Sequence, residues 1–182
     1  LARAIDLLRA RPEFQGMPSV EWHGQEHGNG PRLCRAAGAS GEGIRFLPSS
    51  ANVPSLIGSS DALLLPSVSG EGTPNAILEG MSVGRVVIAT DVGDSARIVG
   101  GQGIVVPPND SAALAQAILA FAARPAAERA AMGRAGRERV VRDYALEKIG
   151  AAYEELHASC LDMALYDDHS GEAAIAHHHN AR

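Results

Sequence analysis

The 182 residues, 46% hydrophobic and 20% charged, have the balance of an ordinary globular chain of about one domain. The net charge of −5 argues against a dedicated nucleic-acid partner, and no apolar run reaches the roughly 18 residues that span a membrane. Cys34 and Cys160 are too few for a disulfide framework and indicate a reducing compartment. The opening residues lack the apolar core of a signal peptide, so a cytoplasmic location is expected.

Short apolar segments alternate with segments of helical periodicity over most of the chain. Strands are predicted at residues 20–24, 44–47, 62–65, 86–90 and 104–106. Helices are predicted near the start, ending before Pro12, and at residues 31–37, 53–59, 74–83 and 95–99, with a longer one capped by Asp110 and ended by Pro125. Nearly all-apolar strands that alternate with helices indicate an α/β fold, with a parallel sheet covered by helices on both faces.

The last third is predicted to be helical. Residues 125–142 are rich in Ala, Arg and Glu, which is typical of a solvated helix. An apolar stripe follows at three- and four-residue spacing and predicts a helix with one apolar face, which either packs on the chain's own sheet or covers a partner domain. Its members are Leu146, Ile149, Tyr153, Leu156 and Cys160. Residues 161–182 are polar without apolar periodicity, so we expect one domain over 1–160 and a disordered tail over 161–182.

The most informative segment is residues 69–80, where two glutamates flank the start of a predicted helix. Thr73 is a good N-cap, and Pro74 suits the first helical position. The amides of residues 75–77 would then be unpaired at the positive end of the helix dipole, which favours a phosphate. Glu71 would lie before the cap, at the mouth of the site, and Glu79 on the face of the helix opposite its apolar side.

This segment directly follows a predicted strand at residues 63–65. Ligands of parallel sheets bind beyond the carboxyl ends of the strands, so the segment lies where a ligand is expected. A ligand with a central phosphate and hydroxyls at both ends would suit two carboxylates on either side of a helix start. The sequence therefore predicts a nucleotide-sugar site.

The motif Glu-Gly-Thr-Pro-Asn-x3-Glu at residues 71–79, preceded by Leu-Leu-Leu-Pro-Ser, resembles retaining glycosyltransferases of family 4. Residues 86–93 and 103–110 resemble later parts of the same domain in the same order. The similarity covers roughly residues 20–156. It implies the carboxyl-terminal, Rossmann-like half of a GT-B fold, in which two such domains face each other across a cleft.

The resemblance implies a role for each matched residue. Glu79 resembles the acid that binds the ribose hydroxyls, and Glu71 resembles the acid that contacts the transferred sugar. Leu47 and Pro48 lie where the family's backbone meets the base. Backbone contacts to sugar and diphosphate would come from Gly72, Thr73, Pro74 and Asn75. No cofactor and no metal are expected, because helix amides and basic side chains can neutralise the diphosphate.

The resemblance also implies transfer of a sugar with retention of configuration, in bacterial glycan or polysaccharide synthesis. The acceptor would be a glycan, a lipid-linked or a small molecule, at a cytoplasmic location or at the inner membrane face. By this resemblance we expect the given residues to begin after the family's amino-terminal acceptor domain, its first strand of this domain, and the Arg and Lys that hold the diphosphate. We therefore expect the chain alone to bind a nucleotide weakly and to transfer nothing.

Two alternatives are open: a nucleotide-binding module without transfer activity, and a sugar-nucleotide epimerase of the same fold. Both glutamates favour an enzyme over the module, and the sequence shows no group of His and acidic residues that is typical of an epimerase.

Residues 24–31 lack the G-x-G-x-x-G spacing of a dinucleotide site and are interpreted as a turn. Residues 177–179, three consecutive His, read as part of the tail. Asp91 and Asp94 read as turn residues.

Overall fold

The computed structural model describes residues 1–12, 19–23 and 27–176. The chain divides into two compact units, Leu1–Val140 and Val141–Arg182. The division falls within helix α7 (Ala126–Tyr144). The predicted turn at residues 24–31 lies partly, and the His run at 177–179 wholly, outside the described residues.

The described residues of the first unit form five strands in two sheets, and all of their strand pairs are parallel. One sheet pairs β1 (Val20–His23) with β2 (Ile44–Leu47), and the other has the order β3 (Ala62–Leu65), β4 (Val86–Thr90), β5 (Ile104–Val106). The predicted α/β fold with parallel strands is confirmed. The expected single sheet is instead divided, because β1 and β3 are not hydrogen-bonded to each other within the described residues.

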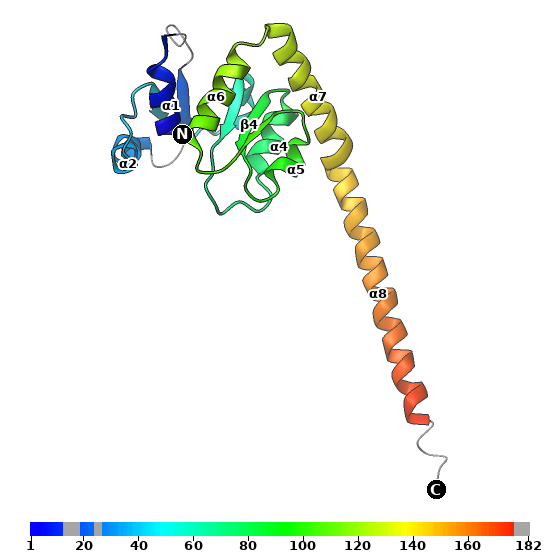
Figure 1. The fold of residues 1–182 in the computed structure, drawn as a ribbon. Helices are drawn as coiled ribbons and strands as arrows, with labels where there is room; N and C mark the ends of the chain where they lie inside the picture. Colours follow the sequence, from blue (N-terminus) through cyan, green and yellow to red (C-terminus); the bar gives the residue numbers. More distant parts are fainter. Residues whose placement is uncertain (13–18, 24–26, 177–182) are drawn as a thin grey trace. The chain divides into compact units, whose positions relative to one another are not determined.

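A helix follows each strand, as parallel neighbours require a crossover connection. The helices of this part are α1 (Ala2–Arg9), η2 (His27–Asn29, 3-10), α2 (Gly30–Ala36), α3 (Val53–Gly58), α4 (Asn75–Ser82), α5 (Ser95–Val99) and α6 (Ser111–Ala122). Helices α1 and α6 lie on one side of β4, and α4 and α5 lie on the other (Figure 1).

Strand β4 is central, and all five of its residues are buried. Val86 and Ile88 belong to the hydrophobic cluster formed with α1 and α6. Val87 points to the other face, toward α4. A Cβ added to Gly80 of α4 would lie 3.0 Å from the Cγ2 atom of Val87, so the helix packs closely on this face. This alternation explains why the strand is continuously apolar up to Thr90.

Three residues stabilise helix ends in the first unit, and the sequence predicted one of them, Asp110. The Asp110 carboxylate accepts hydrogen bonds from two amides of the first turn of α6, at 2.8 and 3.0 Å, which confirms the predicted cap. Gly100 ends α5 in the left-handed conformation, with φ of 54°. Arg139 of α7 donates from Nε to the Ile98 carbonyl at 2.9 Å, so a cation meets the carboxyl end of α5.

The second unit consists of the end of α7 and of α8 (Leu146–Ala176). The sequence predicted a disordered tail at 161–182, whereas α8 continues as helix through Ala176. Residues 151–170 contain neither Pro nor Gly and repeat Ala, Leu and Glu, so helix propensity outweighs the missing apolar periodicity. None of the described helices is both long and apolar enough to cross a membrane.

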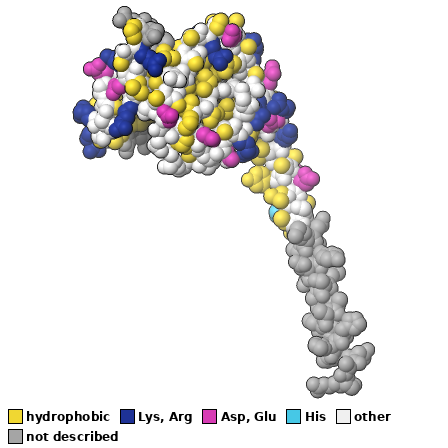
Figure 2. All heavy atoms as spheres, in the orientation of Figure 1, with side chains coloured by type: hydrophobic (Ala, Val, Ile, Leu, Met, Phe, Trp, Pro, Cys, Tyr) yellow, Lys and Arg dark blue, Asp and Glu magenta, His cyan; other side chains and the backbone are white. Residues whose placement is uncertain are grey.

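The apolar stripe of α8 is exposed. Leu146 is 82% and Tyr153 is 70% accessible, and Figure 2 shows hydrophobic side chains along the described turns of this helix. Taken by itself, the described part of this unit therefore leaves these side chains of the stripe exposed.

Gly133 of α7 allows a close backbone approach that no other residue permits. A Cβ at this position would lie 2.0 Å from the Gly84 carbonyl oxygen, in the turn after α4. We expect Gly133→Ala to lower the free energy of unfolding by about 1–3 kcal/mol, because backbone must move. Gly150→Ala is the matched control, since nothing lies within 4 Å of its added Cβ. Urea denaturation would contradict the prediction if both variants were as stable as the parent.

Asp6 of α1 holds the loop at Ser40, whose amide donates to Asp6 Oδ2 at 2.8 Å. The Ser40 hydroxyl and amide lower the pKa of this carboxyl. A lowered folded pKa means that the stabilisation is present above the unfolded value of about 3.9 and is lost as the pH falls through the folded value. We expect Asp6→Ala to destabilise the chain more at pH 6 than at pH 3, since the stabilisation declines as the pH falls toward the lowered folded pKa. Equal losses at both pH values in urea denaturation would contradict this.

Candidate functional site

Glu71 lies in the loop that follows the carboxyl end of β3, and it is half-buried. The Ser67 hydroxyl donates to Glu71 Oε1 at 2.6 Å. Thr90, the buried last residue of β4, donates to the Ser67 carbonyl at 2.6 Å. A chain of hydrogen bonds from the sheet therefore orients the Glu71 carboxylate. Neither Ser67 nor Thr90 was predicted to have a role, although a Thr at the end of an otherwise apolar strand is a signal in the sequence.

The start of α4 differs from the prediction. The helix begins at Asn75 with Pro74 as its N-cap residue, and the Pro74 carbonyl accepts from the Ile77 amide at 3.1 Å. The predicted N-cap, Thr73, instead donates its hydroxyl to Asp94 Oδ2 at 3.1 Å. The amides of Asn75 and Ala76 precede that first hydrogen bond and, as the first amides of a helix, have no intrahelical acceptor. The helix therefore offers two such amides to a ligand rather than the expected three.

Glu79 lies one turn along α4 from Asn75, and both side chains are exposed. The opposite face of the helix buries Ile77 and Met81 against the sheet. The loop thus carries one glutamate at the head of the helix and the helix carries another on its open face. This arrangement matches the predicted order of Glu71, helix amides and Glu79.

Leu47 and Pro48 lie at the carboxyl end of β2, in the other sheet. Leu47 is half-buried and Pro48 is exposed. The Pro48 carbonyl lies 3.2 Å from His23 Nδ1, which can donate to it. The two residues are therefore at the end of a strand, as ligand-contacting residues of parallel sheets are.

The loop after β4 runs against the Glu71 loop. The Asp94 amide donates to the Gly72 carbonyl at 2.9 Å. Hydrogen bonds from Arg97 and then Thr73 lower the pKa of the Asp94 carboxyl. The sequence predicts Asp94 as a turn residue. In the structure Asp94 also contacts Gly72 and Thr73 in the loop of the candidate site.

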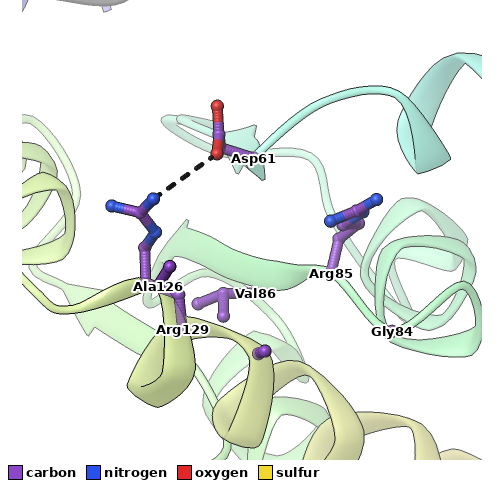
Figure 3. Close-up of a pocket in the computed structure, with 7 residues that line it drawn as sticks. Asp61, Gly84, Arg85, Val86, Ala126 and Arg129 are labelled. Carbon is purple, nitrogen blue, oxygen red and sulfur yellow. Dashed lines mark ion pairs between the residues drawn. The ribbon is translucent and has the colours of Figure 1, made fainter.

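A separate cavity of about 170 Å³ lies at the amino ends of the strands (Figure 3). Asp61 precedes β3 and Arg85 precedes β4, whereas Glu71 follows the carboxyl end of β3. Arg129 points toward Asp61 with a separation of 3.8 Å, and it also donates to two carbonyls at the end of α6 and beyond. Arg85 donates to the Gly58 carbonyl. Arg129 therefore links α7 to Asp61 and to the end of α6, whereas the buried Nε of Arg85 has no hydrogen-bond partner among the described residues.

Among the residues that the structure describes, no three His, Cys, Asp or Glu side chains gather as metal ligands would.

Comparison with known proteins decides the family. The family model described as glycosyl transferases group 1 matches residues 1–124, which include Glu71, Glu79 and the strands on either side. The chain belongs to this family. The predicted membership is confirmed, and the match favours a transferase over an epimerase.

Two curated glycosyltransferases are similar to this chain in sequence. WcaL of Escherichia coli K12, a glycosyltransferase assigned by name to colanic acid biosynthesis, is 37% identical over 106 residues, which are 54% of this chain and 26% of WcaL. The phosphatidyl-myo-inositol mannosyltransferase of Mycobacterium leprae is 35% identical over 98 residues, 52% of this chain and 26% of that enzyme. The chain thus matches about a quarter of each relative.

Solved structures show the same fold. A glycosyltransferase from Rickettsia africae superposes with a TM-score of 0.75 at 23% identity, covering 88% of this chain and 43% of that one. Anabaena HepE, solved with UDP-glucose, superposes with a TM-score of 0.69 at 19% identity, covering 87% of this chain and 44% of that one. The predicted Rossmann-like half of a GT-B fold is therefore confirmed, and the chain spans less than half of these structures.

Proposed function

We propose that this chain binds the nucleotide-sugar donor of a retaining glycosyltransferase. The observation that carries the proposal is the placement of Glu71 and Glu79 around the head of α4, at the carboxyl end of β3. Family membership supplies the reaction class, and the orientation of Glu71 by Ser67 supplies a preorganised carboxylate. HepE, which shares the fold, was solved with UDP-glucose, and this supports a nucleoside diphosphate sugar as the ligand class.

In this proposal Glu79 accepts hydrogen bonds from the ribose hydroxyls, and Glu71 contacts the transferred sugar. The amides of Asn75 and Ala76 face the diphosphate at the positive end of α4. Gly72, Thr73 and Pro74 provide the backbone along the sugar and diphosphate. The backbone of Leu47 and Pro48 meets the base. No metal or cofactor is required, since the helix end offsets part of the diphosphate charge.

Retention follows if the acceptor hydroxyl attacks from the face that the diphosphate leaves. The bond between the anomeric carbon and the phosphate oxygen breaks, and a bond to the acceptor oxygen forms. The acceptor proton passes to the departing diphosphate. Glu71 would stabilise the positive charge that develops on the sugar ring, where a fixed carboxylate acts most strongly.

We place the reaction in bacterial glycan or polysaccharide synthesis, at the cytoplasmic side of the membrane. The two curated relatives support this, since one is named for colanic acid biosynthesis and the other for a phosphatidyl-inositol substrate. A glycan, a lipid-linked molecule or a small molecule could serve as acceptor, held by an amino-terminal domain.

Titration calorimetry of this chain with UDP, GDP and their glucose and mannose conjugates tests the proposal. We expect at least one nucleotide to bind, and free glucose, free mannose and inorganic pyrophosphate to bind more weakly. Glu138→Ala, on the exposed face of α7, serves as a control that should leave binding unchanged. A folded chain that binds pyrophosphate as tightly as every nucleotide would sink the proposed site.

A further inference from the structure

Two loops that are 21 residues apart in sequence are fastened together beside Glu71. The Asp94 amide donates to the Gly72 carbonyl at 2.9 Å, and the Thr73 hydroxyl donates to Asp94 Oδ2 at 3.1 Å. Backbone and side chain of Asp94 therefore hold two consecutive residues of the loop that carries Glu71. A single residue that makes both contacts fixes the path of that loop more firmly than either contact alone.

Gly93 makes this approach possible. A Cβ at this position would lie 2.4 Å from the Glu71 carbonyl oxygen and 2.5 Å from that of Gly72. Its φ of 57° lies in the left-handed region, which also favours glycine. The backbone of one loop thus lies directly on the backbone of the other.

The Asp94 carboxylate is itself oriented. Arg97, one turn along α5, approaches it with both Nε and Nη2, at 3.2 and 2.7 Å. A forked pair of this kind fixes the plane of the carboxylate, so the oxygen that accepts from Thr73 is held in place. The network therefore runs from α5 through Asp94 to the Glu71 loop.

We propose that Asp94 is a positioning residue for the donor sugar: it holds the segment from Glu71 to Thr73 and thereby sets the direction of the Glu71 carboxylate. The ligand class rests on the proposed function, whereas the fastening of the loop does not. Asp94 does not contact the reacting atoms in this assignment. Its effect passes through the loop, so it favours a ligand that carries the sugar over the free nucleotide.

The first test needs no ligand. Amide hydrogen exchange of residues 71–76 should be faster in Asp94→Ala than in the parent chain, and largely restored in Asp94→Asn, which keeps an acceptor oxygen for Thr73. Asp91→Ala is the matched control, because it removes the same side chain from the same loop and should leave exchange unchanged. Parental exchange in a folded Asp94→Ala chain would overturn the positioning role. If Asp94→Ala does not fold, as judged by circular dichroism, Thr73→Val tests the same contact from the other side.

The second test compares two ligands by titration calorimetry, UDP-glucose and UDP, or whichever conjugate and nucleotide the parent binds. Asp94→Ala should weaken binding of the nucleotide sugar by about two- to tenfold more than binding of the free nucleotide. Asp94→Asn should recover most of the difference, and Asp91→Ala should show none. Equal weakening of both ligands would overturn the inference while leaving the proposed function intact. A parent chain that binds neither ligand class would refute the proposed function, and the exchange result would still decide the positioning role.

Discussion

Replacement of Glu71 by alanine is expected to slow sugar transfer by about 10²- to 10³-fold, in a two-domain enzyme that contains this chain. The carboxylate is oriented by the Ser67 hydroxyl at 2.6 Å and lies at the head of α4. A group that acts on the sugar contributes to the transition state and not to binding of the free nucleotide. Affinity for the nucleoside diphosphate should therefore stay within about threefold of the parent value, which is under 1 kcal/mol.

Steady-state kinetics and product-binding calorimetry measure the two quantities separately. Ser67→Ala is the informative companion, because it leaves the Glu71 carboxylate but removes its hydrogen-bond donor. Its transfer rate should fall less than that of Glu71→Ala, and Glu71→Gln should resemble the alanine variant, because the amide lacks the charge. Transfer at the parental rate in Glu71→Ala would refute the assigned role.

Replacement of Glu79 by alanine is expected to weaken nucleotide binding through loss of its hydrogen bonds to the ribose. Hydrogen bonds to a charged group contribute about 1.5–3 kcal/mol, which corresponds to about 10- to 150-fold in Kd. Glu79 is exposed and makes up part of the open face of α4, so little loss of stability should accompany the change.

Ligands that differ at the ribose give the sharpest comparison. Calorimetry with the ribonucleotide and its 2′,3′-dideoxy form should show a large loss for the first and almost none for the second in Glu79→Ala. Glu138→Ala should bind both forms as the parent does. Equal losses for both ligands in Glu79→Ala would show that the carboxylate does not contact the ribose hydroxyls.

The strands and short helices of the first unit were predictable because local signals agree with the fold. The strand predictions at 44–47, 62–65, 86–90 and 104–106 match β2, β3, β4 and β5, and the helix prediction at 95–99 matches α5. These strands are mostly apolar, and most of their ends are marked by Gly, Pro or Asp, so the sequence pattern and the packing agree. The cap at Asp110 was visible for the same reason.

The N-cap prediction failed because it depends on a contact that is distant in sequence. Thr73 has the chemistry of an N-cap, yet its hydroxyl donates to Asp94, which lies 21 residues further on. Gly93 was visible only as a turn residue, because its approach to the Glu71 carbonyl exists only once both loops have folded. The roles of the donor-site residues stay predictions, resting on the motif and on the placement of Glu71 and Glu79.

The division of the strands into two sheets has a consequence for how cooperatively the first unit unfolds. Val20 of β1 and Ile44 of β2 pack against the shared hydrophobic cluster, but the two sheets are separate in their backbone pairing within the described residues. Side-chain packing, and no strand pairing within the described residues, joins the two sheets, so the smaller sheet is expected to lose its order at a lower denaturant concentration than the larger one. Trp22, the single tryptophan of the chain, lies in β1 with its ring 5.3 Å from that of Phe46. The fluorescence of Trp22 therefore reports the unfolding of the smaller sheet. We expect the fluorescence transition at a lower denaturant concentration than the loss of helix measured by circular dichroism. Transitions that do not coincide would show that unfolding is not two-state.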